Sequence, residues 1–290
     1  MVKKNLLITG CEGQLGHSIK KLSVNFTDYN FIFKNKHQLN ISDFSLVKEQ
    51  IKENKIDTVI NCAAYTNVSK AEKNKKLANL INNLAVENLA NICFEKSIQL
   101  IHISTDYVFD GKKNTPYNEN DRTNPINYYG YSKLEGEKRV LEKELKNSAI
   151  IRTSWLYSEL KNNFVQKIVN KIYKKQKLMV VCDEVGSPTY SNDLALFIIK
   201  ILSRLNSKRA EIYNFSNQGF CSRYEFACEI LKIIGESMKI VPINSSSFKI
   251  IRPKFSGLDL SKIKNEFIYD LNDWRHSLEI CLKKADSYEI

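Results

Sequence analysis

The sequence has no long apolar segment. No run of about 18 apolar residues occurs in the 290 residues, so the chain offers no candidate transmembrane helix. The N-terminal residues lead quickly into a short apolar run that ends at a glycine, unlike the charged start, apolar core and cleavage site of a secretory signal. We therefore expect a cytoplasmic protein that does not associate with membranes.

Closely spaced cysteine pairs are also missing. The seven cysteines are scattered and odd in number, and no two form a C-x-x-C motif. Zinc sites and dithiol redox centres depend on such pairs, and small disulfide frameworks need an even set. We expect neither a structural metal nor disulfides, which fits a reducing compartment.

Acidic residues are fewer than basic ones, and the net charge is +12. A basic protein can bind nucleic acid, an acidic membrane face or small anions. Lysines here alternate with glutamates, as in residues 133–139 and 143–146, which is typical of solvated helix faces. We therefore expect no nucleic-acid partner, and the positive field suits a substrate that carries a diphosphate.

Short apolar runs alternate with amphipathic segments in the first half of the chain. Strands are expected over residues 5–9, 29–33, 58–62, 100–103 and 149–153, and helices over residues 15–22, 43–54, 77–96 and 127–145. The run at 100–103 is typical of a sheet covered on both faces. This alternation predicts an α/β fold with a doubly wound parallel sheet, the Rossmann arrangement.

The pattern becomes less regular after about residue 155. Helices are expected over residues 162–174, 192–205, 222–234 and 273–284, and extended segments over 178–181, 211–215 and 240–242. We divide the chain into a dinucleotide-binding domain, residues 1–154, and a smaller C-terminal substrate-binding lobe, residues 155–290. The segment at about 190–215 is expected to return to the first domain, with a cleft between the two parts.

Three glycines follow the first predicted strand. Gly10, Gly13 and Gly16 form a G-x-x-G-x-x-G turn that opens a helix. Such a turn lets the backbone approach a pyrophosphate, whose charge the helix N-terminus favours. A turn that only packs helix against strand is the alternative, and the position after the first strand favours dinucleotide binding.

The second predicted strand ends without an acidic residue. NAD-binding proteins usually carry a carboxylate there for the adenosine ribose, whereas this chain has none before Asp43. Lys34 or Lys36 can instead meet the 2′-phosphate of NADPH, although both can also be ordinary surface lysines. We favour NADPH as the cofactor and keep NADH as the alternative.

Tyr129 and Lys133 stand four residues apart near the start of a predicted helix and therefore project from one face. A phenol with a pKa of about 10 is a poor proton shuttle at neutral pH, but a nearby ammonium stabilises the phenolate and lowers that pKa. The spacing also arises by chance in lysine-rich helices. Tyr128 and Tyr131 are competing phenols, and Tyr131 is expected to point elsewhere.

Thr105 and Asp106 follow the fourth predicted strand. They lie at the carboxyl edge of the sheet, where open α/β sheets bind ligands. The Thr105 hydroxyl can donate to a substrate carbonyl, and Asp106 can accept from a sugar hydroxyl. A polar turn without function is the alternative, and the tyrosine-bearing helix that follows favours a site.

Taken together, these motifs resemble the extended short-chain dehydrogenase/reductase family. The resemblance covers nearly the whole chain, through residues 13–16, 61–66, 71–72, 104–109, 129–133, 152–157, 186–189, 193–195 and 252–256. It implies that NADPH or NADH reduces the C4 ketone of dTDP-4-dehydro-β-L-rhamnose, giving a precursor of cell-surface polysaccharide. Tyr129 would donate the proton. Lys133 would adjust the pKa of Tyr129 and bind the nicotinamide ribose.

The resemblance also implies which residues border the ligands. Cofactor-bordering residues are Gly10, Gly13, Gln14, Leu15, Gly16, Asn40, Ile41, Ala63, Ala64, Tyr65 and the backbone of Ile103, beside Tyr129 and Lys133. Substrate-bordering residues are Thr105, Asp106 and Trp155. Thr105 would also adjust Tyr129 as a third catalytic residue, and Trp155 has the alternative role of an apolar plug between lobes.

Three departures from the family pattern bear on the site. Asn40 and Ser69 stand where the family commonly has aspartates, which affects cofactor contacts and loop geometry. Some members carry a glutamate near the position of Ser18 that helps bind magnesium between subunits, so we expect no metal here. A reductase or epimerase of another nucleotide-linked 4-keto-6-deoxy sugar and a non-catalytic regulatory subunit remain alternatives, and a homodimer remains open.

Overall fold

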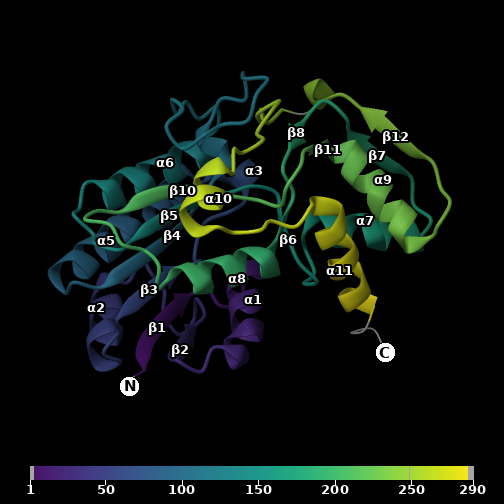
Figure 1. The fold of residues 1–290 in the computed structure, drawn as a ribbon. Helices are drawn as coiled ribbons and strands as arrows, with labels where there is room; N and C mark the ends of the chain where they lie inside the picture. Colours follow the sequence, from purple (N-terminus) through teal and green to yellow (C-terminus); the bar gives the residue numbers. More distant parts are fainter. Residues whose placement is uncertain (1–2, 248, 287–290) are drawn as a thin grey trace.

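A computed structural model describes residues 3–247 and 249–286, and its centre is a six-stranded parallel sheet (Figure 1). The strands are β1 (Lys4–Thr9), β2 (Tyr29–Lys34), β3 (Thr58–Asn61), β4 (Gln99–Thr105), β5 (Ala149–Thr153) and β10 (Glu211–Phe215). Their order across the sheet is β2-β1-β3-β4-β5-β10, and all neighbours are parallel. The predicted α/β class and each predicted strand of this sheet are confirmed.

Helices cover both faces of the sheet, as Figure 1 shows. One face carries α1 (Gln14–Leu22) and α8 (Ser191–Ile201), and the other carries α2 (Phe44–Glu53), α5 (Ala85–Glu95) and α6 (Tyr128–Leu141). Successive side chains of a strand point to opposite faces. Leu6 and Ile8 of β1 therefore join the core under α1 and α8, whereas Leu7 joins the core under α2 and α5. Burial of each such side chain stabilises the fold by roughly 1.5–3 kcal/mol.

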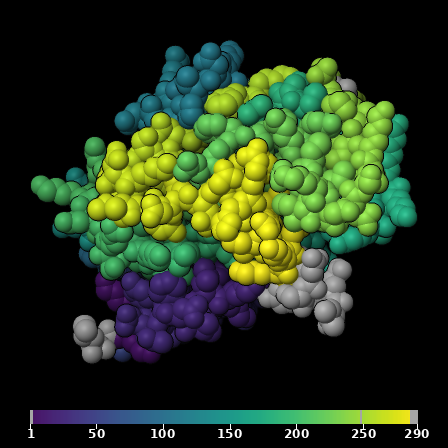
Figure 2. Space-filling model, turned by 45° about the vertical axis from the view of Figure 1, so that its right-hand side comes forward, coloured from purple at the N-terminus to yellow at the C-terminus, as the bar shows by residue number. Residues whose placement is uncertain are grey.

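A smaller lobe has its own core. It contains α7 (Phe164–Tyr173), α9 (Arg223–Ile234), α11 (Trp274–Asp286) and the parallel pair β7 (Leu178–Val181) and β12 (Ile240–Ile243). Two short pairs lie between this lobe and the large sheet: β6 (Leu156–Tyr157) with β9 (Thr189–Tyr190), and β8 (Val185–Gly186) with β11 (Cys221–Ser222). Figure 2 shows the last part of the chain, in yellow, running across both parts.

The segment between β9 and β11 belongs to the large sheet rather than to the smaller lobe. β10 pairs with β5 along its whole length, and α8 packs against α1. Helix α10 (Ser261–Phe267) also packs on this side, through Ile263 and Phe267. The chain therefore leaves the sheet after β5, builds part of the lobe, and comes back.

Several helices differ from their predicted bounds. The predicted helix at 77–96 consists of α4 (Lys75–Asn79), a π-helical turn η2 (Leu80–Leu84) and α5. Helix α6 ends at Leu141 and α8 at Ile201, although Leu145 and Leu205 beyond them are buried in the core. Apolar periodicity continues through such buried turns, so it overestimates helix length.

The remaining short elements were not predicted from the sequence. They are α3 (Val68–Lys73) and the 3₁₀ turns η1 (Ser23–Asn25), η3 (Asp106–Val108) and η4 (Ser245–Ser247), together with α10 and the two-residue strands. Each is too short to show a period. Among the described residues, no helix is long and apolar enough to cross a membrane.

Candidate active site

A cavity of about 800 Å³ lies at the carboxyl ends of the sheet strands, a size typical of ligand sites. Its walls come from the glycine turn after β1, the loop after β3, the end of β4, the start of α6, the segment after β5, and Arg223 of the smaller lobe. β1 and β3 are neighbours although β2 lies between them in the chain, which makes this edge the topological switch point. Apart from Lys34, every residue that the sequence proposed for a site lines this cavity.

The glycine turn packs its backbone directly against neighbouring backbone. A Cβ on Gly10 would lie 2.9 Å from the Cα of Ala63, and a Cβ on Gly16 would lie 2.5 Å from the Cα of Cys11. Gly10 also has φ of +63°, which disfavours other residues. Gly13 caps α1, no acidic residue occupies the first turn, and no described side chain caps the helix. The positive end of α1 therefore faces the cavity, as binding of a diphosphate requires.

One end of the cavity lies beside the segment that follows β2. Lys36, Asn40 and Ile41 line it, whereas Lys34 ends β2 outside the lining. Of the two lysines that the sequence proposed, the structure thus brings only Lys36 to the cavity. Glu12 of the glycine turn also lines this end and accepts a hydrogen bond from Asn35 Nδ2 at 2.6 Å. Sequence reasoning missed Glu12, because the family pattern looks for an acid after β2.

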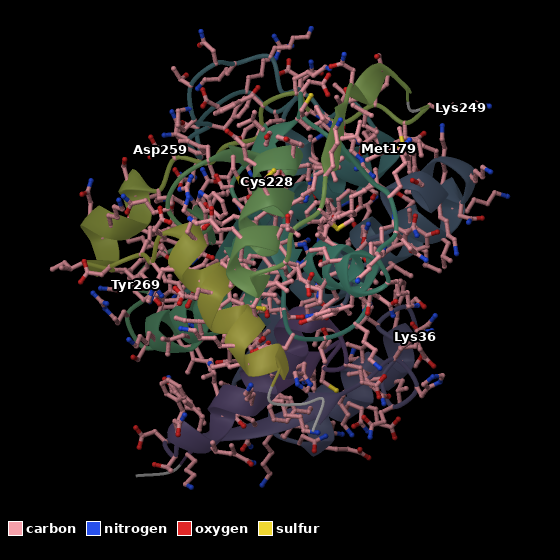
Figure 3. All side chains as sticks on the ribbon, turned by 90° about the vertical axis from the view of Figure 1, so that its right-hand side faces the viewer. Lys36, Met179, Cys228, Lys249, Asp259 and Tyr269 are labelled. Atoms are coloured by element: carbon pink, nitrogen blue, oxygen red, sulfur yellow. The ribbon has the colours of Figure 1, made fainter. Side chains whose placement is uncertain are left out.

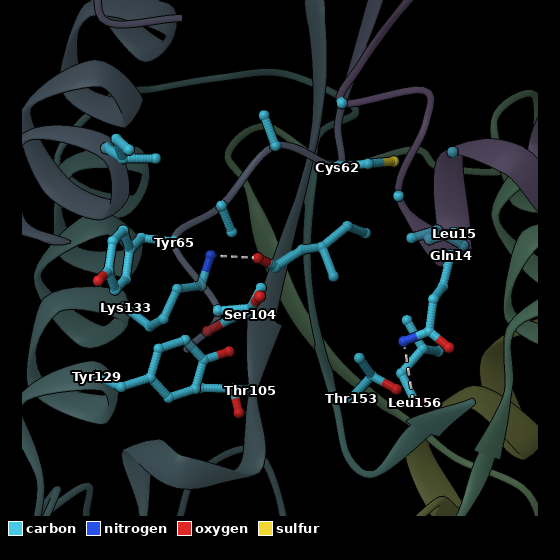
Figure 4. A pocket seen from close by; sticks show the side chains of 18 of the residues that line it. Gln14, Leu15, Cys62, Tyr65, Ser104, Thr105, Tyr129, Lys133, Thr153 and Leu156 are labelled. Carbon is cyan, nitrogen blue, oxygen red and sulfur yellow. Dashed lines mark hydrogen bonds between the residues drawn. The ribbon is translucent and has the colours of Figure 1, made fainter. Parts of the chain in front are cut away.

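Tyr129 and Lys133 reach from α6 toward β4, with Thr105 beside them (Figure 4). The helix starts at Asn127, whose side chain accepts from the N–H of Gly130 at 2.9 Å. Gly130 packs so closely on the turn η3 that a Cβ there would lie 2.1 Å from the carbonyl oxygen of Tyr107. This contact fixes the position of Tyr129 relative to the carboxyl ends of the strands.

Lys133 is buried, with 2% of its surface exposed. Its Nζ donates to the carbonyl oxygen of Ile103 at 2.6 Å and lies 3.2 Å from Nε2 of His102. Burial lowers the pKa of Lys133 to about 8, and the carboxylate of Glu137 opposes this shift. The side chain is therefore still mainly an ammonium at neutral pH.

The prediction that Lys133 lowers the pKa of Tyr129 is wrong for this structure. Burial raises the pKa of Tyr129 well above its ordinary value, and a side-chain hydrogen bond with Thr105 opposes the rise. The ammonium of Lys133 is held by the Ile103 carbonyl, as the dashed line in Figure 4 shows, and does not offset the burial. The phenol is consequently protonated at neutral pH, which is the form that a proton donor needs.

Thr105 and Asp106 form a buried polar pair at the end of β4. Thr105 Oγ1 donates to Asp106 Oδ1 at 3.0 Å and accepts from the N–H of Tyr107. Asp106 is 2% exposed, and burial raises its pKa to about 6, against hydrogen bonds from Ser256 and Thr105. The carboxylate is thus ionised at neutral pH and protonated under mild acid.

A buried ion pair between α6 and the sheet was not predicted. Glu137 of α6 accepts two hydrogen bonds from Arg152 of β5, at 2.9 and 2.7 Å, and a third from Ser104 of β4. Both charged side chains are at most 3% exposed. Bidentate pairs of this kind fix orientation, so the pair holds α6 against two strands. No local sequence pattern indicates this pair, because the partners lie in different elements.

A second unpredicted set of contacts, made of hydrogen bonds, joins the loop after β3 to α6. Asn82, in the π-helical turn η2, accepts from the N–H of Tyr65 at 2.8 Å and donates to the Tyr65 carbonyl at 3.0 Å. The same amide donates to Ser132 Oγ at 3.0 Å. π-Helical turns often occur at functional sites, and this one fixes the loop after β3 relative to α6.

Known proteins share the sequence pattern and the fold of this chain. Residues 4–287 match the family model described as RmlD substrate binding domain. The chain is 36% identical over 285 residues to dTDP-4-dehydrorhamnose reductase of Aggregatibacter actinomycetemcomitans, covering 94% of this chain and 97% of that protein. The chain belongs to the RmlD family of dTDP-4-dehydrorhamnose reductases. The family resemblance drawn from the motifs is confirmed.

Other RmlD relatives extend the comparison. The spore coat polysaccharide biosynthesis protein SpsK of Bacillus subtilis is 37% identical over 284 residues, covering 97% of this chain and 98% of that protein. The crystal structure of dTDP-4-dehydrorhamnose reductase from Bacillus anthracis in complex with NADP superposes with a TM-score of 0.91 at 33% identity, covering 98% and 99% of the two chains. The RmlD family is thus shown by sequence and by fold, and the expected oxidoreductase class is confirmed.

Proposed function

We propose that the protein is a cytoplasmic enzyme that reduces the C4 ketone of dTDP-4-dehydro-β-L-rhamnose with NADPH and forms dTDP-L-rhamnose. The observation that carries this proposal is the protonated phenol of Tyr129, which shares one cavity with the Gly10–Gly16 turn in a chain of the RmlD family. The reductase activity for which the A. actinomycetemcomitans relative is named and the NADP in the B. anthracis structure support it.

The residues of the cavity fit NADPH. The Gly10–Gly16 turn would hold its diphosphate, Lys36 and Asn40 its adenosine half, and Lys133 its nicotinamide ribose. Bound there, the cofactor supplies the hydride for C4 of the sugar. The close packing at Gly10 and Gly16 leaves no room for a side chain at either position, because a Cβ there would meet neighbouring backbone atoms.

The chain's own residues supply the proton and the charge stabilisation. Tyr129 gives its phenolic proton to the ketone oxygen as negative charge develops there. Lys133, whose ammonium is held by the Ile103 carbonyl, would bind the nicotinamide ribose rather than tune the phenol. Thr105 hydrogen-bonds with Tyr129 and so orients the phenol. Asp106 accepts from a hydroxyl of the sugar.

Substrate binding is expected to weaken below about pH 6, because protonation removes the carboxylate of Asp106 as an acceptor. The pKa is raised from 3.8 to about 6, so the ionised form dominates above pH 6 and is lost as the pH falls through that value. The KM for the sugar nucleotide, measured from pH 5 to 8, should rise on the acid side by about tenfold per unit. Asp106→Asn should show a high KM with no such acid limb; a limb that persists in this variant would assign it to another group.

Cofactor preference is expected to depend on Lys36 and not on Lys34. Lys36→Ala should raise the KM for NADPH by about tenfold and leave that for NADH within about twofold, because only NADPH carries the 2′-phosphate. Figure 3 shows Lys36 on the N-terminal layer, below Met179 of the smaller lobe. Lys34→Ala is the matched control and should change neither value. Equal losses with both cofactors would reject the assignment of Lys36.

A coupled assay tests the function as a whole. Purified protein, NADPH and dTDP-4-dehydrorhamnose should give stoichiometric oxidation of the cofactor, with dTDP-L-rhamnose identified by NMR. A product with another configuration at C4 would show a different sugar-nucleotide reductase. Conversion without added reductant would show an epimerase, and absence of any conversion would favour a non-catalytic role.

A further inference from the structure

Arg223 belongs to helix α9 of the smaller lobe and lines the cavity. Among the described residues, no other residue of α9 does so. Arg223 is the first residue of α9, and its guanidinium lies over the indole of Trp155, with Cζ 3.4 Å from the ring centroid. Phe164 of α7 lies on the same guanidinium at 5.2 Å. Arginine over an aromatic face is an attractive arrangement, so two rings fix the position of this cation.

Trp155 is itself held in place from the other side. Its backbone adopts φ of +45°, which is uncommon outside glycine. Gly186 lies against the indole, and a Cβ there would be 2.6 Å from Cε2 of Trp155. The indole therefore packs as a fixed support under Arg223, in addition to lining the cavity.

The charge of Arg223 has no close counter-ion. Within residues 3–247 and 249–286, no carboxylate lies within 4.0 Å of its guanidinium, and its buried Nε has no hydrogen-bond partner. The nearby Glu184 lies 3.9 Å from Arg252, and both Glu184 and Asp106 act on Arg223 only at longer range, where Arg252 is a second cation that opposes them. Burial lowers the pKa of Arg223, as expected for a cation partly removed from water. A partly desolvated cation of this kind is stabilised by an anion that enters the cavity.

The substrate of the proposed function offers one kind of anion. The two phosphates are the only ionised groups of a dTDP-linked 4-keto sugar at neutral pH. The cofactor's diphosphate is assigned to the glycine turn, and the ketone must lie at Tyr129. The planar guanidinium of arginine matches phosphate oxygens in a bidentate arrangement.

We propose that Arg223, supported by Trp155, binds the diphosphate of the sugar nucleotide. The proposal rests on the proposed function for the identity of that nucleotide. Arg223 fixes the nucleotide end of the substrate while the C4 ketone lies at the phenol of Tyr129. The alternative is a stack that only joins Trp155 to α9 and touches no ligand.

The chain offers a matched control for this alternative. Arg275 lies over Trp274 with Cζ 4.2 Å from the ring, is 56% exposed, and does not line the cavity. Arg275→Met removes an arginine–tryptophan stack from the same lobe without touching the site. Arg223→Met removes the stack and the cation, whereas Arg223→Lys removes most of the stack and keeps the charge.

Calorimetric titration with dTDP measures the subsite without turnover. Arg223→Met should raise the Kd of dTDP by about 10- to 100-fold and reduce its dependence on salt. Arg223→Lys should lose less and keep the salt dependence, and Arg275→Met should bind dTDP like the wild type. The Kd of NADPH should be unchanged in all three, which also reports that each variant is folded.

Two results would overturn the subsite. One is a dTDP affinity of Arg223→Met equal to that of the wild type. The other is a loss in Arg223→Met that leaves the salt dependence unchanged, since that would mark a packing effect. Steady-state turnover separates this failure from failure of the proposed function. If the enzyme is active and Arg223→Met leaves the KM for the sugar nucleotide unchanged, only the subsite is refuted. If dTDP binds through Arg223 but the ketone is not reduced, only the proposed reaction is refuted.

Discussion

Tyr129→Phe is expected to lower kcat by about 10²- to 10⁴-fold, because the substitution removes the proton donor and leaves the cofactor cradle intact. The phenol is partly buried and protonated at neutral pH, so it can give its proton to the ketone oxygen. Turnover is measured as NADPH oxidation with saturating sugar nucleotide. NADPH affinity, measured by fluorescence, should stay within about twofold of the wild type.

Tyr131→Phe provides the control for this change. Tyr131 lies two residues further along the same helix, but its side chain is 45% exposed. Loss of that hydroxyl should leave kcat unchanged. If Tyr129→Phe turned over at the rate of the wild type, Tyr129 would have no part in proton transfer, and the proposed mechanism would be wrong.

Gly130→Ala is expected to reduce kcat by about 10²-fold or more, because it displaces the reacting phenol without removing it. The new methyl group would lie 2.1 Å from the Tyr107 carbonyl oxygen, so α6 must move away from the end of β4. Tyr129 and Lys133 move with it. Both kcat and the melting temperature should fall, the first measured by NADPH oxidation and the second by calorimetry.

Gly235→Ala separates the effect on geometry from the effect on stability. Gly235 ends α9 with φ of +76°, and no atom lies within 4 Å of a Cβ placed there. Alanine at this left-handed position should cost about 1 kcal/mol of stability and leave kcat unchanged. A Gly130→Ala enzyme with full kcat would show that the close packing at Tyr107 does not position Tyr129.

The sheet and the glycine turn were predictable because their signals are local. Leu6, Leu7 and Ile8 form an apolar run, and Gly10, Gly13 and Gly16 follow it in the spacing that a strand–turn–helix unit needs. The carboxyl ends of parallel strands meet at one edge, so the same reasoning brought Thr105 and Tyr129 together. Local pattern and topology were sufficient for these residues.

The electrostatics of the site depended on contacts that no local pattern contains. The spacing of Tyr129 and Lys133 predicted a lowered pKa for the phenol, but the Ile103 carbonyl holds the ammonium and burial dominates. Lys34 and Lys36 were equivalent in sequence, and only the turn after β2 decides which one faces the cavity. Long-range partners such as Glu137 and Arg152 were invisible for the same reason.

The path of the chain through the sheet has a consequence for dissecting the protein. A fragment that stopped after β5 would lack β10 and α8, which complete the sheet and cover α1. The backbone groups of β5 that face β10 would lose their hydrogen-bond partners. The buried residues Ile150 and Ile151 would then lie in an exposed edge strand. Exposed strands of this kind recruit other chains, so the nucleotide-binding half, expressed alone, should aggregate instead of folding as an independent module.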